Sequence, residues 1–259
     1  MKFKTFLLCI LFSLTTAKAL VLEDLVREGK LEQTLRDQRI GFYLGSFDPL
    51  HCGHVQTTFE ALNFDTCDYV LIYPAWGGDE MKNRTDVAIR LEMLFAKFKD
   101  DTRVIVTRMN PIELQQALTQ KDGGRSPVKG KSYVKPSIPG ARFFGLIGSD
   151  TAFELAKDAK KRDTFMAGMQ VPKKYAAHTI GGVIALPAEG FIISLRNDDS
   201  IDQLEGKIGD RPIVDSYTTY APFTSSTKVR AAIKAGKSIE DMVPEEMIAI
   251  IEKYNLYRD

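Results

Sequence analysis

The sequence predicts an α/β fold: a doubly wound, Rossmann-like parallel sheet with flanking helices and a small helical part at the C-terminal end. Short apolar runs suited to buried strands alternate with segments of helical apolar spacing, which favours parallel strands joined by helices. A turn rich in small residues joins the first strand to a helix, and α/β folds bind anionic ligands at such turns. The chain of 259 residues, 44% hydrophobic and 27% charged, has the length and composition of one globular domain with insertions.

The order of the predicted elements follows from these patterns. Helices are expected over residues 22–35, from the turn to about residue 62, and over 86–99. The last of these places Val87, Leu91, Leu94, Phe95 and Phe98 on one face. Apolar runs predict strands at residues 39–44, 68–74, 104–106, 141–147, 182–186 and 191–195.

Residues 1–19 are predicted to be a secretory signal peptide that precedes a single domain, residues 20–259. Two lysines provide a positive start, residues 6–14 are apolar but too few to span a bilayer, and Ala17-Lys18-Ala19 matches a cleavage signal. We therefore expect an exported protein, periplasmic or secreted, with no stable membrane insertion after cleavage. A buried N-terminal helix and an extension from a misplaced start codon are the alternatives, and without a true signal the protein is expected in the cytoplasm.

Residues 121–140 are predicted to form a flexible basic insertion. Glycine, proline and lysine crowd there, and apolar periodicity is absent. The charge could steer phosphates, but a solvated linker explains it equally well, so no role is assigned.

Charge and cysteine content narrow the classes of partner and metal site that the chain could have. The formal net charge of +1 gives no indication of a nucleic acid or an acidic membrane as a partner. Cys9 lies in the leader, and Cys52 and Cys67 are expected to be free thiols, although a bridge between them is conceivable. Zinc is disfavoured because no second cluster of cysteine or histidine completes a four-ligand site with His51, Cys52 and His54. No metal site made by the protein is predicted.

Residues 45–54, GSFDPLHCGH, form the first predicted anion site. Glycines let the backbone approach a phosphate closely, and the start of the following helix points free N–H groups at it. Imidazoles at this position can donate to phosphate oxygens as charge develops there. The residues expected to contact the anion are Gly45, Ser46, Phe47, His51, Gly53 and His54.

Residues 224–230, TSSTKVR, form a second candidate anion site at the start of a helix. Hydroxyls there cap backbone N–H groups or donate to phosphate, and an arginine can bind two oxygens at once. Taken alone, the segment could be a variant of a helix capping box. Its candidate ligands are Ser225, Ser226, Thr227 and Arg230.

The first motif resembles the GxFDPxHxGH segment of the nucleotidylyltransferase superfamily, and the second resembles that superfamily's ISSTxxR segment, with threonine in the first position. Residues 242–257, MVPEEMIAIIEKYNLY, resemble the closing helices of nicotinate- and nicotinamide-mononucleotide adenylyltransferases. The resemblance covers residues 39–110 and 141–259. It implies adenylyl transfer from ATP to a pyridine mononucleotide, giving a pyridine dinucleotide and pyrophosphate, with Mg²⁺ bound through the ATP phosphates.

The resemblance also implies roles for single residues. His51 and His54 would donate to the α- and β-phosphates, and Arg230 with Thr227 would hold the leaving pyrophosphate, so His51, His54 and Arg230 are the catalytic candidates. ATP would contact Gly45, Ser46, Phe47, Gly53, Ser225, Ser226 and Thr227. The mononucleotide would contact Gly148 and Asp150, which end the strand at 141–147, and Lys82, for which plain surface charge is the alternative.

The match has departures. An aromatic partner for the pyridine ring is not evident after Asp150, where Phe153 and Phe165 are candidates, and Arg196 matches a family arginine only loosely.

Alternatives remain open at this point. A pantetheine-phosphate adenylyltransferase or a glycerol-phosphate cytidylyltransferase shares the first motif, and an exported chain could keep the fold as a non-catalytic nucleotide-binding module. No ring-facing arginine is evident, so tolerance of both nicotinate and nicotinamide mononucleotide is expected. The implied partners are ATP and the pyridine mononucleotide, with a homo-oligomer left open.

Overall fold

The computed structural model describes residues 20–75, 84–119, 135–157, 169–170, 183–184, 187–196, 199–209, 211–219 and 224–258. Residues 1–19, Lys82, Phe165 and most of the 121–140 segment lie outside the described residues. The signal peptide and the flexible insertion therefore stay predictions.

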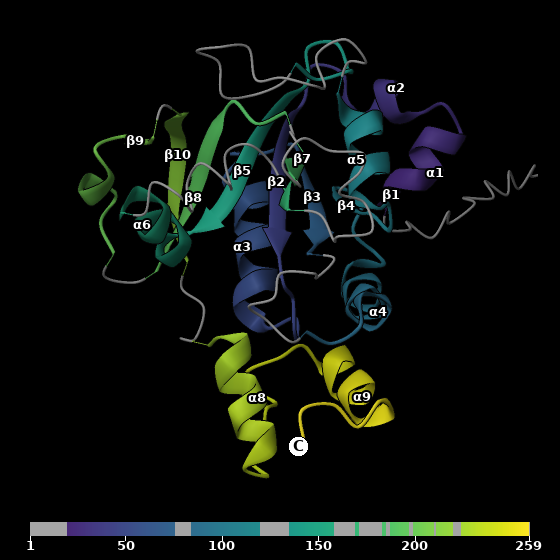
Figure 1. Ribbon diagram of the computed structural model, residues 1–259, viewed down its shortest axis with the longest axis vertical. Helices are drawn as coiled ribbons and strands as arrows, with labels where there is room; N and C mark the ends of the chain where they lie inside the picture. Colours follow the sequence, from purple (N-terminus) through teal and green to yellow (C-terminus); the bar gives the residue numbers. More distant parts are fainter. Residues whose placement is uncertain are drawn as a thin grey trace, which may run out of the picture.

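An eight-stranded sheet forms the centre of the molecule (Figure 1), in the order β1-β4-β3-β2-β5-β8-β10-β9. All neighbours are parallel except β9 and β10. Chain order reverses between β2 and β5, and doubly wound sheets bind ligands at the carboxyl ends of the strands at this point. The expected Rossmann-like α/β fold is confirmed. The strands are β1 Leu20–Val21, β2 Arg39–Gly45, β3 Tyr69–Pro74, β4 Val104–Val106, β5 Arg142–Gly148, β8 Gly190–Arg196, β9 Lys207–Ile208 and β10 Arg211–Thr219.

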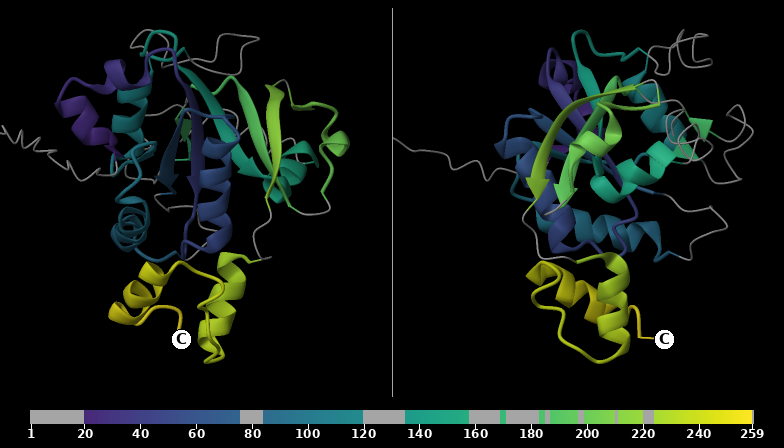
Figure 2. Two further views of the ribbon diagram at one scale, coloured as in Figure 1. Left: turned by 180° about the vertical axis from the view of Figure 1, so that it is seen from behind. Right: turned by 90° about the vertical axis from the view of Figure 1, so that its left-hand side faces the viewer.

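Helices cover both faces of the sheet, because the central strands β2, β3, β4, β5 and β8 bury apolar side chains on both sides. One apolar core joins α3, α4 and α9 to the sheet, and a second joins α1, α2 and α5 to the opposite face. Helices α8 and α9 lie beyond the ends toward which β2 and β3 point (Figures 1 and 2). None of the helices in the described part of the chain is long and apolar enough to cross a membrane. The helices are α1 Leu22–Arg27, α2 Leu31–Leu35, α3 Cys52–Asn63, α4 Val87–Phe98, α5 Pro111–Leu118, α6 Ser149–Lys157, the 3₁₀ helix η2 Ile201–Leu204, α8 Ser226–Lys234 and α9 Glu245–Lys253.

Two predicted elements differ from the structure in extent or in placement. The helix expected over 22–35 is two helices, because Gly29 adopts a φ of +67° that a continuous helix cannot contain. Within the segment 182–186, the described strand β7 (Val183–Ile184) pairs antiparallel with β6 (Met169–Gln170), apart from the main sheet. In the main sheet, the strand that follows β8 is instead β10, whose mixed sequence gave no apolar run.

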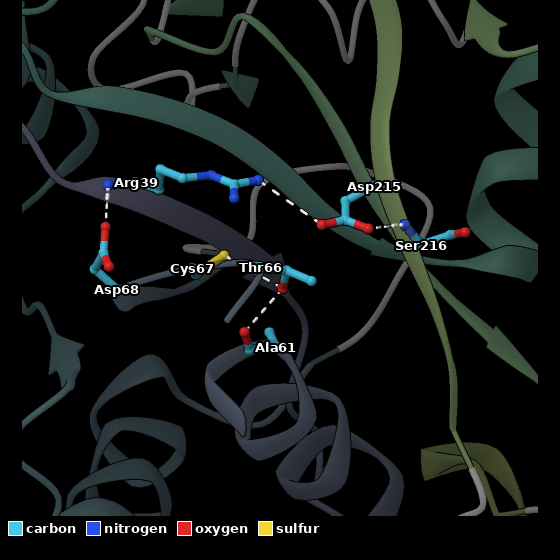
Figure 3. A network of polar contacts seen from close by, with 7 residues as sticks. All are labelled: Arg39, Ala61, Thr66, Cys67, Asp68, Asp215 and Ser216. Carbon is cyan, nitrogen blue, oxygen red and sulfur yellow. Dashed lines mark hydrogen bonds and ion pairs between the residues drawn. The ribbon is translucent and has the colours of Figure 1, made fainter. Parts of the chain in front are cut away.

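A polar network ties the sheet together near the amino ends of its strands (Figure 3). The backbone N–H of Arg39 donates to Asp68 Oδ2 at 2.7 Å, and its guanidinium lies 3.8 Å from Asp215 Oδ2. Cys67 is buried beside this network, and burial raises the pKa of its thiol to about 11. Cys52 and Cys67 are both free, as expected. The network holds β2 from the end opposite to the one that carries the first motif.

Candidate functional site

The β2–α3 turn, residues 46–51, carries the first motif. Phe47 points into the core with no exposed surface, so the turn presents backbone rather than an aromatic ring. A Cβ on Gly45 would lie 2.8 Å from Phe47 Cζ, and the backbone at Phe47 adopts a φ of +49°. Glycine at position 45 is therefore required by packing against Phe47.

His51 and His54 form a stacked pair at the start of α3. Their ring centroids are 3.6 Å apart with an interplanar angle of 25°, and the backbone N–H of His51 donates to His54 Nδ1 at 3.3 Å. Because Nδ1 accepts this hydrogen bond, the proton of neutral His54 is on Nε2. The buried Nδ1 atom of His51 has no hydrogen-bond partner among the described residues.

Both imidazoles are neutral near neutral pH. Burial, assisted by the charge of Arg196, lowers the pKa of His51 to about 4. Burial also lowers the pKa of His54 well below its ordinary value, and the neighbouring His51 and Arg196 add to the effect. The pair therefore offers neutral N–H donors rather than fixed positive charges.

This burial predicts a loss of stability in acid. Unfolded His51 would bind a proton below its ordinary pKa of 6.5, whereas folded His51 stays neutral down to about 4. The unfolded state therefore binds more protons in that window, and the free energy of unfolding should fall by on the order of 3 kcal/mol as the pH drops through it. Urea unfolding across the window measures this loss, and a His51→Asn variant should lose less. Equal losses in the two proteins would contradict the assignment.

The second motif docks on the β2–α3 turn. Ser226 Oγ donates to the carbonyl of Pro49 at 3.0 Å, and Arg230 donates from one guanidinium nitrogen to the carbonyl of Asp48 at 2.6 Å. The other terminal nitrogen of Arg230 donates to Thr227 Oγ1 at 3.3 Å. The two segments that the sequence singled out thus meet in space.

The start of α8 keeps polar groups next to the histidines. Ser225 caps the helix by accepting the N–H of Lys228 at 3.3 Å. Thr224 is buried, and its Oγ1 has no partner among the described residues. A Cβ on Gly53 would lie 3.1 Å from His51 Nδ1 and 3.9 Å from Thr224 Cγ2, so glycine leaves room between the two motifs.

Gly148 and Asp150 lie at the carboxyl end of β5, the neighbour of β2. Asp150 is exposed, and its Oδ2 accepts a hydrogen bond of 3.2 Å from Arg196 at the end of β8. A Cβ on Gly148 would lie 2.8 Å from Asp150 Oδ1, so the glycine makes room for this carboxylate. Phe153 packs against the apolar cluster around α6, and an aromatic partner for the pyridine ring is not identified among the described residues.

Arg90 was missed from the sequence. It is 1% exposed on α4 and donates to the carbonyls of Thr85 at 2.8 Å, Ser46 at 2.7 Å and Ala75 at 2.6 Å. The carbonyls of Ser46 and Ala75 follow β2 and β3, and that of Thr85 precedes α4. One guanidinium therefore fixes three segments around the turn. The signal was present, because Arg90 interrupts the apolar face of the 86–99 helix, three residues after Val87.

Asp48 and Tyr257 were also missed. The Asp48 carboxylate is 4% exposed, and its oxygens accept the backbone N–H of Thr85 at 3.0 Å and the hydroxyl of Tyr257 at 2.5 Å. Burial, together with the hydrogen bond to Asp48, raises the pKa of Tyr257 above its ordinary value, so the hydroxyl stays a donor. Arg84 adds a hydrogen bond of 3.0 Å to Ser46 Oγ on the other side of the turn.

Metal ligands do not gather in the described part of the chain: no group of three or more His, Cys, Asp or Glu side chains there could hold an ion. The donors that converge on the turn are instead imidazole, hydroxyl, guanidinium and backbone N–H groups, which bind anions.

No protein-family model matches the chain. It is 26% identical over 227 residues to a Clostridium tetani protein named "Probable nicotinate-nucleotide adenylyltransferase", covering 83% of this chain and 96% of that one. A Gemmatimonas aurantiaca protein of the same name is 27% identical, over 85% of this chain and 93% of its own length. A Thermus thermophilus protein of that name is also 27% identical, over 85% of this chain and 100% of its own.

Solved structures agree on the fold. The Plasmodium falciparum nicotinic acid mononucleotide adenylyltransferase complexed with NaAD superimposes with a TM-score of 0.52 at 17% identity, over 85% of this chain and 97% of that one. The complex of the same enzyme with APC gives 0.51 at 16% identity, with the same coverage. The resemblance first seen in two short motifs is therefore confirmed along most of the chain: it resembles the nicotinate-nucleotide adenylyltransferases of the nucleotidylyltransferase superfamily.

Proposed function

We propose that the protein is an enzyme that transfers the adenylyl group of ATP to a pyridine mononucleotide. The observation that carries the proposal is the meeting of the two anion-binding motifs on the β2–α3 turn, at the carboxyl edge of the sheet where the chain order reverses. The names of its relatives support the same reaction and favour nicotinate mononucleotide as the acceptor.

The chemistry needs positioning more than it needs a strong base. A 5′-phosphate oxygen of the mononucleotide attacks the α-phosphorus of ATP, the bond to the bridging oxygen breaks, and pyrophosphate leaves with the electron pair. The acceptor phosphate is already ionised, so catalysis consists of alignment and charge stabilisation. Nε2 of His54 supplies a neutral N–H donor, since its Nδ1 accepts from the backbone of His51.

The other residues of the turn would orient the triphosphate. The start of α3 lies beside the start of α8, which carries Ser225, Ser226, Thr227 and Arg230. Arg230 and Ser226 also fix the turn itself through the carbonyls of Asp48 and Pro49. We infer that MgATP is the substrate, with the Mg²⁺ entering bound to the triphosphate, where it would neutralise part of the phosphate charge.

The acceptor is the finer part of the proposal. Nicotinate and nicotinamide mononucleotide differ by a carboxylate against a carboxamide, and a site that reads one strictly leaves buried polar groups unpaired with the other. We propose nicotinate mononucleotide as an acceptor and nicotinamide mononucleotide as a tolerated second one.

A turnover assay tests the proposal. Purified protein with MgATP should release pyrophosphate and form a dinucleotide with nicotinate mononucleotide. It should do the same with nicotinamide mononucleotide, and the kcat/KM values for the two acceptors should differ by less than about a thousandfold. Phosphopantetheine with ATP, and glycerol phosphate with CTP, are the control pairs. Turnover with a control pair alone would replace the proposed acceptor, and MgATP binding without turnover on any acceptor would favour a non-catalytic nucleotide-binding module.

A further inference from the structure

The C-terminal part of the chain contacts the β2–α3 turn along its length. Arg230 and Ser226 bind the carbonyls of Asp48 and Pro49, and the carbonyl of Met242 accepts the N–H of Cys52, where α3 begins, at 3.0 Å. These contacts hold the backbone of the turn. The hydroxyl of Tyr257 makes a different contact, because it holds a side chain, the carboxylate of Asp48.

Asp48 is the point where three segments join. One carboxylate oxygen accepts the N–H of Thr85, which precedes α4, and the other accepts the hydroxyl of Tyr257. The Thr85 hydroxyl in turn donates to the Tyr257 hydroxyl at 3.2 Å. The carboxylate is 4% exposed, so water cannot readily replace a donor that is removed.

Strain in the backbone supports a fixed arrangement on both sides of this contact. Phe47, which precedes Asp48, has a φ of +49°, and Tyr257 has a φ of +63°. Bulky side chains rarely adopt this left-handed region, and they do so where surrounding contacts enforce it. At Tyr257, the enforcing contacts in the described residues are its hydroxyl bonds and its packing against the core of α3, α4 and α9.

We propose that Tyr257 is a positioning residue for the proposed adenylyl transfer: its hydroxyl holds the Asp48 carboxylate and thereby fixes the turn that aims His51 and His54. Tyr257 acts through Asp48, and no contact of its own with the nucleotide is required. The inference rests on the proposed function for its rate effect, whereas its effect on the shape of the turn is independent of any activity.

Tyr257→Phe removes the hydroxyl and keeps the ring. We expect kcat for dinucleotide formation to fall about 10- to 100-fold, as for a small misplacement of reacting groups, while the KM for MgATP changes much less. Adding Asp48→Asn to Tyr257→Phe should lower kcat less than Asp48→Asn does in the wild type, because the shared contact is already lost.

Tyr254→Phe is the matched control. Its hydroxyl donates to the exposed carboxylate of Glu92 at 2.8 Å, so the same chemical change is made three residues away without touching the turn. Rates are compared per folded molecule, with folding measured by urea unfolding. Equal kcat values for the wild type, Tyr254→Phe and Tyr257→Phe would overturn the proposal and leave Tyr257 a purely structural residue.

A second readout separates this inference from the proposed reaction. The chain has only three histidines, so their protonation can be followed by NMR. In Tyr257→Phe the pKa of His51 should rise from about 4 toward its ordinary 6.5 as the turn opens to water, and it should not move in Tyr254→Phe. If the pKa of His51 shifts in Tyr257→Phe but the wild type transfers no adenylyl group, the positioning role of Tyr257 is supported and the proposed reaction is refuted. If the wild type is active but Tyr257→Phe changes neither the pKa of His51 nor kcat, only the positioning role of Tyr257 is refuted.

Discussion

Replacing His54 with alanine is expected to lower kcat about 100- to 1,000-fold, the usual loss when one preorganised donor to a developing charge is removed. The Nε2–H donor of His54 is neutral and held by the backbone of His51, so its hydrogen bond strengthens only as charge moves to the bridging oxygen. Binding of the mononucleotide should change little. Steady-state kinetics with both substrates varied, together with calorimetric binding of the acceptor, measure the two quantities.

Two further variants identify the nitrogen that matters. Glutamine can place an amide N–H near the position of Nε2, whereas asparagine places its polar atoms near Nδ1. His54→Gln should therefore retain more turnover than His54→Asn. An alanine variant within a few-fold of the wild type would remove His54 from the catalytic residues.

Arg90→Met is expected to destabilise the fold by about 3 to 5 kcal/mol, because it leaves three carbonyl groups without their donor in a place that water hardly reaches. The guanidinium that is lost is 1% exposed and binds Thr85, Ser46 and Ala75. Methionine keeps most of the side-chain length, so the loss reports hydrogen bonds more than a cavity. Urea unfolding gives the change in free energy.

Arg103→Met is the matched control for this substitution. Arg103 is exposed and donates to one carbonyl, that of Leu62, at 3.1 Å. Its replacement should change the free energy of unfolding by less than about 1 kcal/mol, as is usual for surface positions. Similar losses for the two arginines would mean that the three carbonyls around the turn find other partners.

The sequence was most informative where function depends on short segments. A buried strand, a small-residue turn and a helix start lie within a few residues of each other, so their pattern predicted the β2–α3 turn with His51 and His54. The same holds for Ser225 to Arg230 at the start of α8. The central strands β2, β3, β4, β5 and β8 were also predicted, because strands buried on both faces read as continuous apolar runs.

Residues that act across the fold could not be placed in this way. Asp48 and Tyr257 are distant in the sequence, and nothing local in either segment indicates that one holds the other. Strand β10 was missed because Pro212 and Asp215 interrupt its apolar run. It lies next to the edge strand β9, where the sheet is less completely buried. Gly29 looked compatible with one helix, since a single glycine lowers helix propensity without requiring a break.

The sequence separations of the contacts that shape the β2–α3 turn bear on how the protein folds. The hydrogen bonds from Ser226 to Pro49, from Arg230 to Asp48 and from Tyr257 to Asp48 span 177, 182 and 209 residues. Closing such long loops carries a large entropic penalty that local helices and adjacent strands do not face. The sheet around β2 and β3 can therefore assemble while the turn still lacks these partners. Competence to bind a nucleotide should emerge as one of the last events on the folding pathway, after most of the secondary structure has formed.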